Sequence, residues 1–163
     1  MLSGTGRLKV AIYVKEFSKK ESELFPDRKA REMCKAFIQN QKQWRTVREY
    51  CDDYSKSNDL LQLKKLIVEG GEGQFDLVIT SEAGRFGEDV GVAYQNAKKL
   101  LSLGIGTIFI ADDINTRHSV GMLKLEIMAQ MLESKKRLQS ERVKEGLRKK
   151  RKKQEKEIDV NQL

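Results

Sequence analysis

The sequence predicts an α/β fold: a mostly parallel sheet of four to five strands, flanked by helices and followed by one long C-terminal helix. Segments rich in β-branched and aromatic residues alternate along the chain with segments whose apolar residues recur every three or four positions. Residues 75–80 and 106–111 are almost continuously apolar, as in strands that are buried on both faces. A fourth and much longer helical pattern begins near Ser119. Alternating strands and helices are the signature of a parallel α/β sheet.

The first half of the chain begins with a strand at Leu8–Val14, and the polar residues 15–23 after it form a loop. Pro26 fits the first turn of a helix that continues to about Gln43. Its apolar positions are Ala30, Met33, Cys34, Phe37 and Ile38. A second strand is expected at Trp44–Cys51.

The middle of the chain repeats this alternation. Ser57-Asn58-Asp59 offers N-cap side chains for a helix that ends at Gly70-Gly71. Its apolar positions are Leu60, Leu63, Leu66 and Ile67. A buried strand at 75–80, a helix at about 88–103 and a further strand at 106–111 follow. These elements make one domain, residues 8–118.

The last helix is expected from Ser119 to about Lys153, and a flexible tail is expected at residues 154–163. Roughly 35 helical residues span about 50 Å, more than a domain of this size can bury. Apolar residues cover more than one face of its first half, namely Met122, Leu123, Leu125, Met128, Met131 and Leu132. This breadth favours packing on both the parent domain and a second chain, so a homodimer or higher homo-oligomer is expected. The alternative is a helix buried within one chain.

The charge of the chain is concentrated at the end of this helix. Residues 135–157 contain 12 Lys or Arg and 4 Asp or Glu, so their net charge of +8 equals that of all 163 residues. Six consecutive basic residues, 148–153, form the centre of this segment. Clustered cations bind polyanions by releasing condensed counterions, which favours DNA as a partner. The alternative is a solvated helix end.

Several classes of protein are not favoured. Cys34 and Cys51 are the two cysteines, and with the single His118 they form no metal-ligand spacing, so neither a metal nor another cofactor is expected. His118 is expected to belong to the cap of the last helix. Nothing at the start reads as a secretion signal, and no apolar run approaches the roughly 20 residues of a membrane span. A cytoplasmic protein without membrane contact is expected.

Four segments in order carry a resemblance to a known family. They are Val10–Lys15 (VAIYVK), Gly73–Ile79 (GQFDLVI), Leu100–Thr116 (LLSLGIGTIFIADDINT) and Glu133–Lys150 (ESKKRLQSERVKEGLRKK). Together they cover about residues 8–150, and the chain resembles the catalytic domain of serine site-specific recombinases, the resolvase and invertase group. The resemblance implies metal-independent DNA strand exchange through a 5′-phosphoserine intermediate. Arginines would stabilise the phosphorane, because guanidinium groups match phosphate oxygens bidentately.

The catalytic pattern of that family is altered in this chain. Where the family has Tyr-x-Arg-x-Ser, the chain has Tyr13-Val14-Lys15-Glu16-Phe17, and Ser18 lies one residue beyond the expected nucleophile. The glutamine of the first helix aligns with Ala30. The family's Asp-Arg-x-x-Arg aligns with residues 84–88 (GRFGE), so only Arg85 is retained and Glu88 places a negative charge near the phosphate site.

Ser18 is therefore the candidate nucleophile, with Lys15 and Arg85 as its cationic support. Each also has a simpler interpretation, a loop serine for Ser18 and a surface arginine on a glycine-flanked turn for Arg85. Asp112-Asp113 resembles the acidic cluster of phosphoacceptor receivers only weakly, because those acids follow the first strand, where this chain has Lys15 and Glu16.

The hypothesis favoured by these patterns is a DNA-binding, serine-recombinase-like protein of site-specific recombination with weak or no strand-exchange activity. Its partners would be DNA, a second copy of itself or an active recombinase. The expected DNA-binding residues are Arg142, Arg148, Lys149, Lys150, Arg151, Lys152 and Lys153. The alternative is an active serine recombinase that cleaves and rejoins DNA through Ser18.

Overall fold

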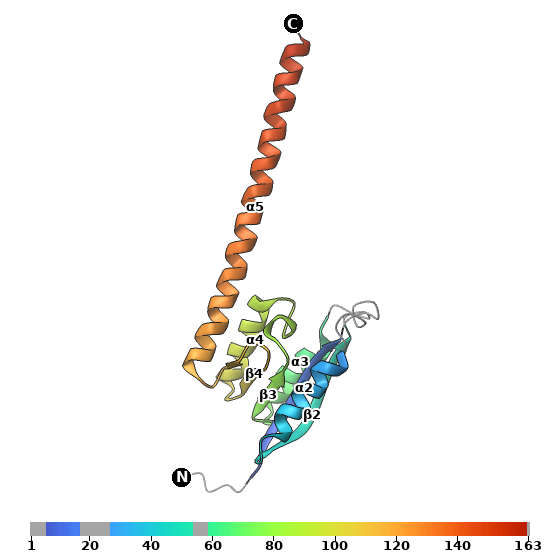
Figure 1. Ribbon diagram of the computed structural model, residues 1–163, viewed down its shortest axis with the longest axis vertical. Helices are drawn as coiled ribbons and strands as arrows, with labels where there is room; N and C mark the ends of the chain where they lie inside the picture. The colour runs from blue at the N-terminus through green and yellow to red at the C-terminus, as the bar shows by residue number, and fades with distance from the viewer. Residues whose placement is uncertain (1–5, 17–26, 54–58, 163) are drawn as a thin grey trace. The chain divides into compact units, whose positions relative to one another are not determined.

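Five strands form one sheet in the order β2-β1-β3-β4-β5 (Figure 1). The computed structural model describes residues 6–16, 27–53 and 59–162. The strands are β1 (Leu8–Glu16), β2 (Trp44–Asp53), β3 (Leu77–Thr80), β4 (Gly106–Phe109) and β5 (Ile114–Asn115). The first four pair in parallel, whereas β5 pairs antiparallel with β4. The predicted fold class is confirmed.

The helices are α2 (Asp27–Gln39), α3 (Leu61–Gly71), η1 (Ala83–Arg85, a 3-10 turn), α4 (Val90–Ser102) and α5 (Ser119–Asn161). The first helix ends at Gln39 instead of near Gln43, because β2 begins only five residues later at Trp44. Strand β5 was not expected, since two residues are too short to produce a periodic pattern.

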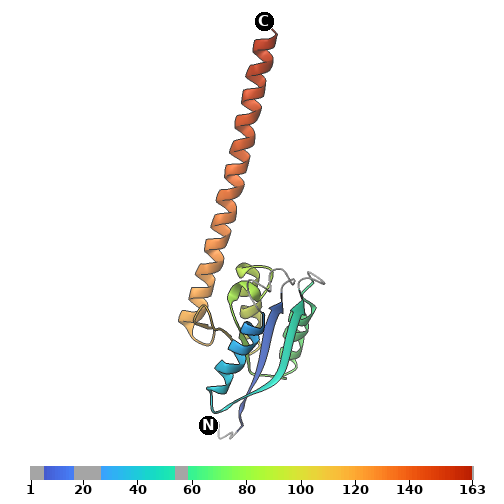
Figure 2. The same cartoon turned by 45° about the vertical axis from the view of Figure 1, so that its right-hand side comes forward.

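Two apolar layers hold the sheet. On one face, α2 packs Cys34 and Ile38 against Ile12 and Ile79 of β1 and β3, and Figure 2 shows α2 lying along β1. On the other face, α3 and α4 contribute to a larger cluster whose fully buried members include Tyr13, Leu66, Phe75, Phe86, Leu100 and Phe109. Strands β1 and β3, whose carboxyl ends carry the candidate residues, are therefore fixed by apolar packing on both faces of the sheet.

Helix α3 is capped by a residue from another element. The predicted caps Ser57 and Asn58 lie outside the described residues, and the residue that precedes the helix is Leu60, with φ +46° and no side-chain cap. The backbone N–H groups of Gln62 and Leu63 donate instead to the Asp52 carboxylate, at 2.8 and 2.9 Å. The expectation of a local cap was thus wrong, because a carboxylate at the end of β2 meets the helix N-terminus.

The chain divides into two compact units, residues 1–129 and 130–163. The first unit includes the start of α5, where Gly121, Leu125 and Ala129 are buried. In the second unit, the described residues 130–162 are exposed, apart from a half-buried Leu132. The helix continues to Asn161 instead of ending near Lys153, since residues 154–161 contain neither Pro nor Gly.

Candidate functional site

The carboxyl ends of β1 and β3 bring two of the predicted catalytic residues together. The two strands are parallel and adjacent, with Tyr13 opposite Thr80, so the segments that follow them leave the same edge of the sheet. Lys15 lies near the end of β1, and Arg85 ends the η1 turn that follows β3. Ser18, the predicted nucleophile, and Phe17 lie outside the described residues.

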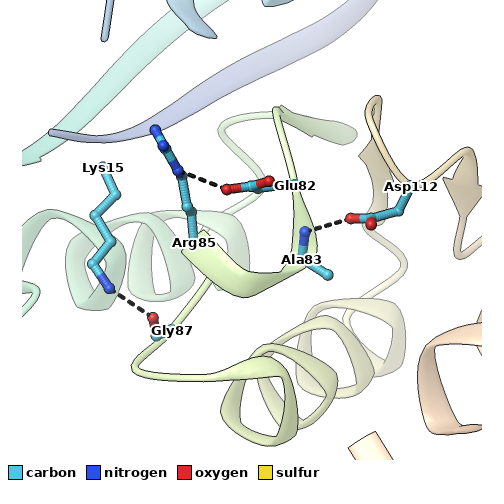
Figure 3. Close-up of polar contacts among 6 residues, drawn as sticks. All are labelled: Lys15, Glu82, Ala83, Arg85, Gly87 and Asp112. Carbon is cyan, nitrogen blue, oxygen red and sulfur yellow. Dashed lines mark hydrogen bonds and ion pairs between the residues drawn. The ribbon is translucent and has the colours of Figure 1, made fainter. Parts of the chain in front are cut away.

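Lys15 is a buried cation, with a fractional exposure of 4%. Its Nζ donates a hydrogen bond of 3.0 Å to the backbone oxygen of Gly87 (Figure 3). Burial lowers the pKa of Lys15, and the neighbouring Arg85 lowers it further, whereas Asp52 and Glu88 act in the opposite direction. Lys15 therefore lies among two carboxylates and a second cation.

Arg85 is held by the carboxylate of Glu82, the residue that immediately precedes the turn. Its Nε lies 2.8 Å from Oε1 of Glu82, close enough for both a hydrogen bond and an ion pair. The Arg85 side chain is 16% exposed and that of Glu82 is 46% exposed. Arg85 is thus half-buried and paired, unlike the surface arginine of the simpler interpretation.

The η1 turn itself is attached to the end of β4. The backbone N–H of Ala83 donates to Oδ2 of Asp112 at 2.7 Å. The glycines around Arg85 were considered as backbone donors to a phosphate. Gly87 instead directs its carbonyl oxygen toward Lys15, and Gly84 is exposed.

Asp112 therefore has a structural partner, and Asp113 is exposed with φ +52°. Among the residues that the structure describes, no group of three or more His, Cys, Asp and Glu side chains could hold a metal ion. His118 is exposed and its backbone oxygen accepts from Met122, which agrees with its expected place at the start of α5.

Sequence reasoning missed Glu82 and Asp112 as partners of the η1 turn. Glu82 lies three residues before Arg85, a spacing that brings side chains together in a helical turn, but no periodic pattern marks a turn of three residues. The contact of Asp112 depends on the pairing of β3 with β4. That contact could not be read from the local sequence.

The predicted DNA-binding residues lie on the part of α5 that belongs to the second unit. Arg142 and residues 148–153 are all exposed. Arg148 approaches Glu145 at 3.8 Å, and the two side chains are 68% and 58% exposed. Such an exposed pair contributes little to stability, so Arg148 remains able to contact a polyanion.

No helix among the described parts of the chain is both long and apolar enough to cross a membrane. Helix α5 is long, but its residues 130–161 are rich in charged side chains.

Comparison with solved structures identifies similar folds at low identity. The N-terminal catalytic domain of TP901-1 integrase is 21% identical with a TM-score of 0.66, and the match covers 80% of this chain and 98% of that chain. A resolvase family site-specific recombinase from Streptococcus pneumoniae is 18% identical with a TM-score of 0.67, covering 83% and 94%. The C-terminal catalytic domain of ISC1926 TnpA, an IS607-like serine recombinase, is 12% identical with a TM-score of 0.53, covering 63% and 70%.

A comparison with curated protein sequences gives no match. The family model described as "Resolvase, N terminal domain" matches residues 11–156, nearly the whole chain. This match confirms the resemblance read from the four sequence segments. The chain therefore belongs to the resolvase N-terminal domain family, and its fold is that of serine recombinase catalytic domains.

Proposed function

We propose that this protein binds DNA in site-specific recombination and has weak or no strand-exchange activity of its own. The observation that carries the proposal is the run of six exposed basic residues at 148–153 within α5. Consecutive residues of an α-helix point in different directions around its axis, so a subset of these charges can face a given duplex and contact its phosphates. Such contacts give salt-dependent binding with little sequence preference.

The environment of Lys15 and Arg85 supports the proposal that strand-exchange activity is weak or absent. Lys15 donates to a backbone oxygen, and Arg85 is paired with Glu82. Glu88 takes the place of the family's second arginine. An arginine there would attract a phosphate, whereas Glu88 repels it. Because Glu88 is exposed, solvent screens this repulsion, which weakens phosphate binding without abolishing it.

The alternative function is an active recombinase with Ser18 as nucleophile. One observation favours it: Lys15 and Arg85, from segments 70 residues apart, lie close enough for Arg85 to shift the pKa of Lys15. Two cations at the end of a parallel sheet are suited to binding a phosphodiester.

We also propose that two parts of the chain have separate roles, as expected from the sequence. Residues 8–118 would carry the altered catalytic site, and residues 119–153 would mediate self-association and contact DNA. Exposed apolar residues on α5 support self-association, since apolar residues clustered on one helix commonly mark interfaces. In the first unit they are Val120, Leu123 and Ile127, and in the second unit they include Met131 and Leu138.

DNA binding is tested by titrating a fluorescent duplex with the full chain over a series of salt concentrations. Replacement of Lys149, Lys150, Lys152 and Lys153 by Gln should reduce the salt slope by about 0.9 for each phosphate contact that is lost. The matched control replaces four exposed lysines of the first unit by Gln, namely Lys64, Lys65, Lys98 and Lys99. Equal losses of salt slope in the two variants would refute a specific role for residues 148–153, the basic segment.

Strand exchange is tested by looking for a covalent protein–DNA adduct under conditions in which an active recombinase forms one. The proposal expects no adduct. An adduct that disappears in Ser18→Ala would establish the alternative. Mixing the protein with an active recombinase, followed by cross-linking, would reveal the heteromeric pairing.

A further inference from the structure

The contact between Glu82 and Arg85 is built into the geometry of the η1 turn. Glu82 immediately precedes the turn and Arg85 ends it. In a 3-10 turn the side chains of residues i and i+3 lie above one another, which brings this carboxylate onto this guanidinium. Figure 3 shows the two side chains meeting beside the turn, and their closest atoms are 2.8 Å apart.

The backbone of the turn is held in place independently of this ion pair. The N–H of Ala83 donates to Asp112, and the N–H of Phe86 donates to the oxygen of Ala83. Phe86 is fully buried and packs edge-on against both Tyr13 and Phe109. The turn can therefore remain unchanged when a side chain on it moves.

The exposures of the two side chains indicate which of them can leave the ion pair. The Arg85 side chain is 16% exposed, whereas that of Glu82 is 46% exposed. Rotation of Glu82 moves a carboxylate into water, where it is well solvated. Movement of Arg85 would instead disturb a half-buried group, so Glu82 is the partner that can leave.

The charges around Arg85 indicate which ligand could take the place of Glu82. Lys15 lies near enough to Arg85 for the guanidinium to disfavour a second positive charge. An anion bound at Arg85 relieves this repulsion without having to touch Lys15, whose Nζ is directed toward Gly87. A phosphodiester is such an anion, and a guanidinium can bind two of its oxygens at once.

We propose that Glu82 is a built-in competitor for a phosphate ligand of Arg85, occupying the guanidinium until a phosphodiester displaces it. The inference deepens the proposed function and depends on it in one respect, since the phosphate is taken to belong to DNA. It assigns to Glu82 the role of setting the phosphate affinity of the site. Loss of the carboxylate should therefore increase that affinity.

The experiment uses the full chain and the dinucleotide thymidylyl-thymidine, which contains one phosphodiester and therefore tests a single phosphate-binding site. Binding is followed through the backbone amide NMR signals of Gly84 and Arg85. Glu82→Gln should lower the dissociation constant about two- to fivefold, the range expected when a partly exposed ion pair stops competing. Glu32→Gln, at an exposed position on α2, makes the same change in net charge and should have no effect.

A double-mutant cycle identifies the cation on which Glu82 acts. Arg85→Gln should abolish the gain produced by Glu82→Gln, because no guanidinium remains to be released. A gain that persists without Arg85 would contradict the proposal, as would equal dissociation constants for Glu82→Gln and Glu32→Gln or a lack of binding by all variants. Thermal unfolding of each variant confirms that the fold is retained.

The outcome is separable from that of the proposed function. Neutralising Lys149, Lys150, Lys152 and Lys153 should weaken duplex binding and leave dinucleotide binding unchanged. Failure of the dinucleotide experiment alone overturns the role of Glu82. Failure of the duplex experiment alone overturns DNA binding by the basic segment.

Discussion

The hydroxyl of Tyr13 donates a hydrogen bond of 2.9 Å to the carboxylate of Asp52. Asp52 is 6% exposed, and the same carboxylate accepts the backbone N–H groups of Gln62 and Leu63 at the start of α3. One side chain thus joins β1, β2 and α3 beneath the candidate site. Its negative charge also supports Lys15, which is its register partner on the neighbouring strand.

Asp52→Ala should therefore destabilise the first unit by about 2–4 kcal/mol, because three donors lose a charged acceptor in a buried place. Tyr13→Phe removes one of these bonds and should cost about 1 kcal/mol. Urea denaturation of both variants and of the double mutant measures the difference. Equal costs for the two single changes would show that Asp52 does not stabilise α3.

Cys34 predicts a pH dependence of stability. It is fully buried, and burial raises its pKa from 9.0 to about 12. The unfolded thiol ionises first as the pH rises, so this group contributes stability that is complete below pH 9 and is lost between pH 9 and about 12. The loss amounts to about 1.4 kcal/mol for each pH unit.

The free energy of unfolding should consequently fall less steeply above pH 9 in Cys34→Ala than in the natural sequence. The slope is the relevant quantity, because the cavity left by alanine lowers stability at every pH. Ile38→Val, a smaller side chain on the same buried face of α2, should leave the slope unchanged. Parallel curves for Cys34→Ala and the natural sequence would contradict the prediction.

The ionisation of Lys15 should respond in opposite directions to two neighbouring substitutions. Burial and Arg85 lower its pKa, whereas Asp52 and Glu88 raise it. Glu88→Gln should therefore lower the Lys15 pKa further, and Arg85→Gln should raise it. NMR titration of the Lys15 side chain measures both, with Glu32→Gln as the remote control. A shift of the same sign in both variants would be inconsistent with this arrangement of charges.

Two glycines of α5 should respond differently to alanine. A Cβ at Gly121 would overlap the carbonyl oxygen of Asn115 and lie 2.7 Å from its carbonyl carbon, so the close approach of α5 to β5 requires glycine. Gly121→Ala should destabilise the first unit by about 1–3 kcal/mol. Thermal or urea unfolding of that unit provides the measurement.

Gly146→Ala is the matched control on the same helix. A Cβ there meets nothing within 4 Å, so the substitution should stabilise the helix by about 0.8–1 kcal/mol through helix propensity alone. Circular dichroism should show increased helicity. A neutral Gly121→Ala would exclude close packing at β5.

The sequence by itself determined the alternation of strands and helices, the family and the location of the basic segment. These properties depend on local periodicity, on short motifs and on charge composition, all of which are encoded in neighbouring residues. A strand from Leu8 and a helix from Ser119 were predictable for this reason, although β1 continues to Glu16, beyond the predicted end at Val14. Lys15 and Arg85 were selected as candidates by motif position alone.

Only the tertiary structure decided what those candidates contact. Lys15 meets Gly87, 72 residues away, Asp112 meets Ala83, 29 residues away, and Asp52 caps a helix that does not contain it. These contacts follow from the strand order β2-β1-β3-β4-β5, which places the ends of distant strands side by side. Glu82 illustrates the same limit at short range. Its pairing with Arg85 requires the η1 turn, and that turn is held by groups from elsewhere in the fold.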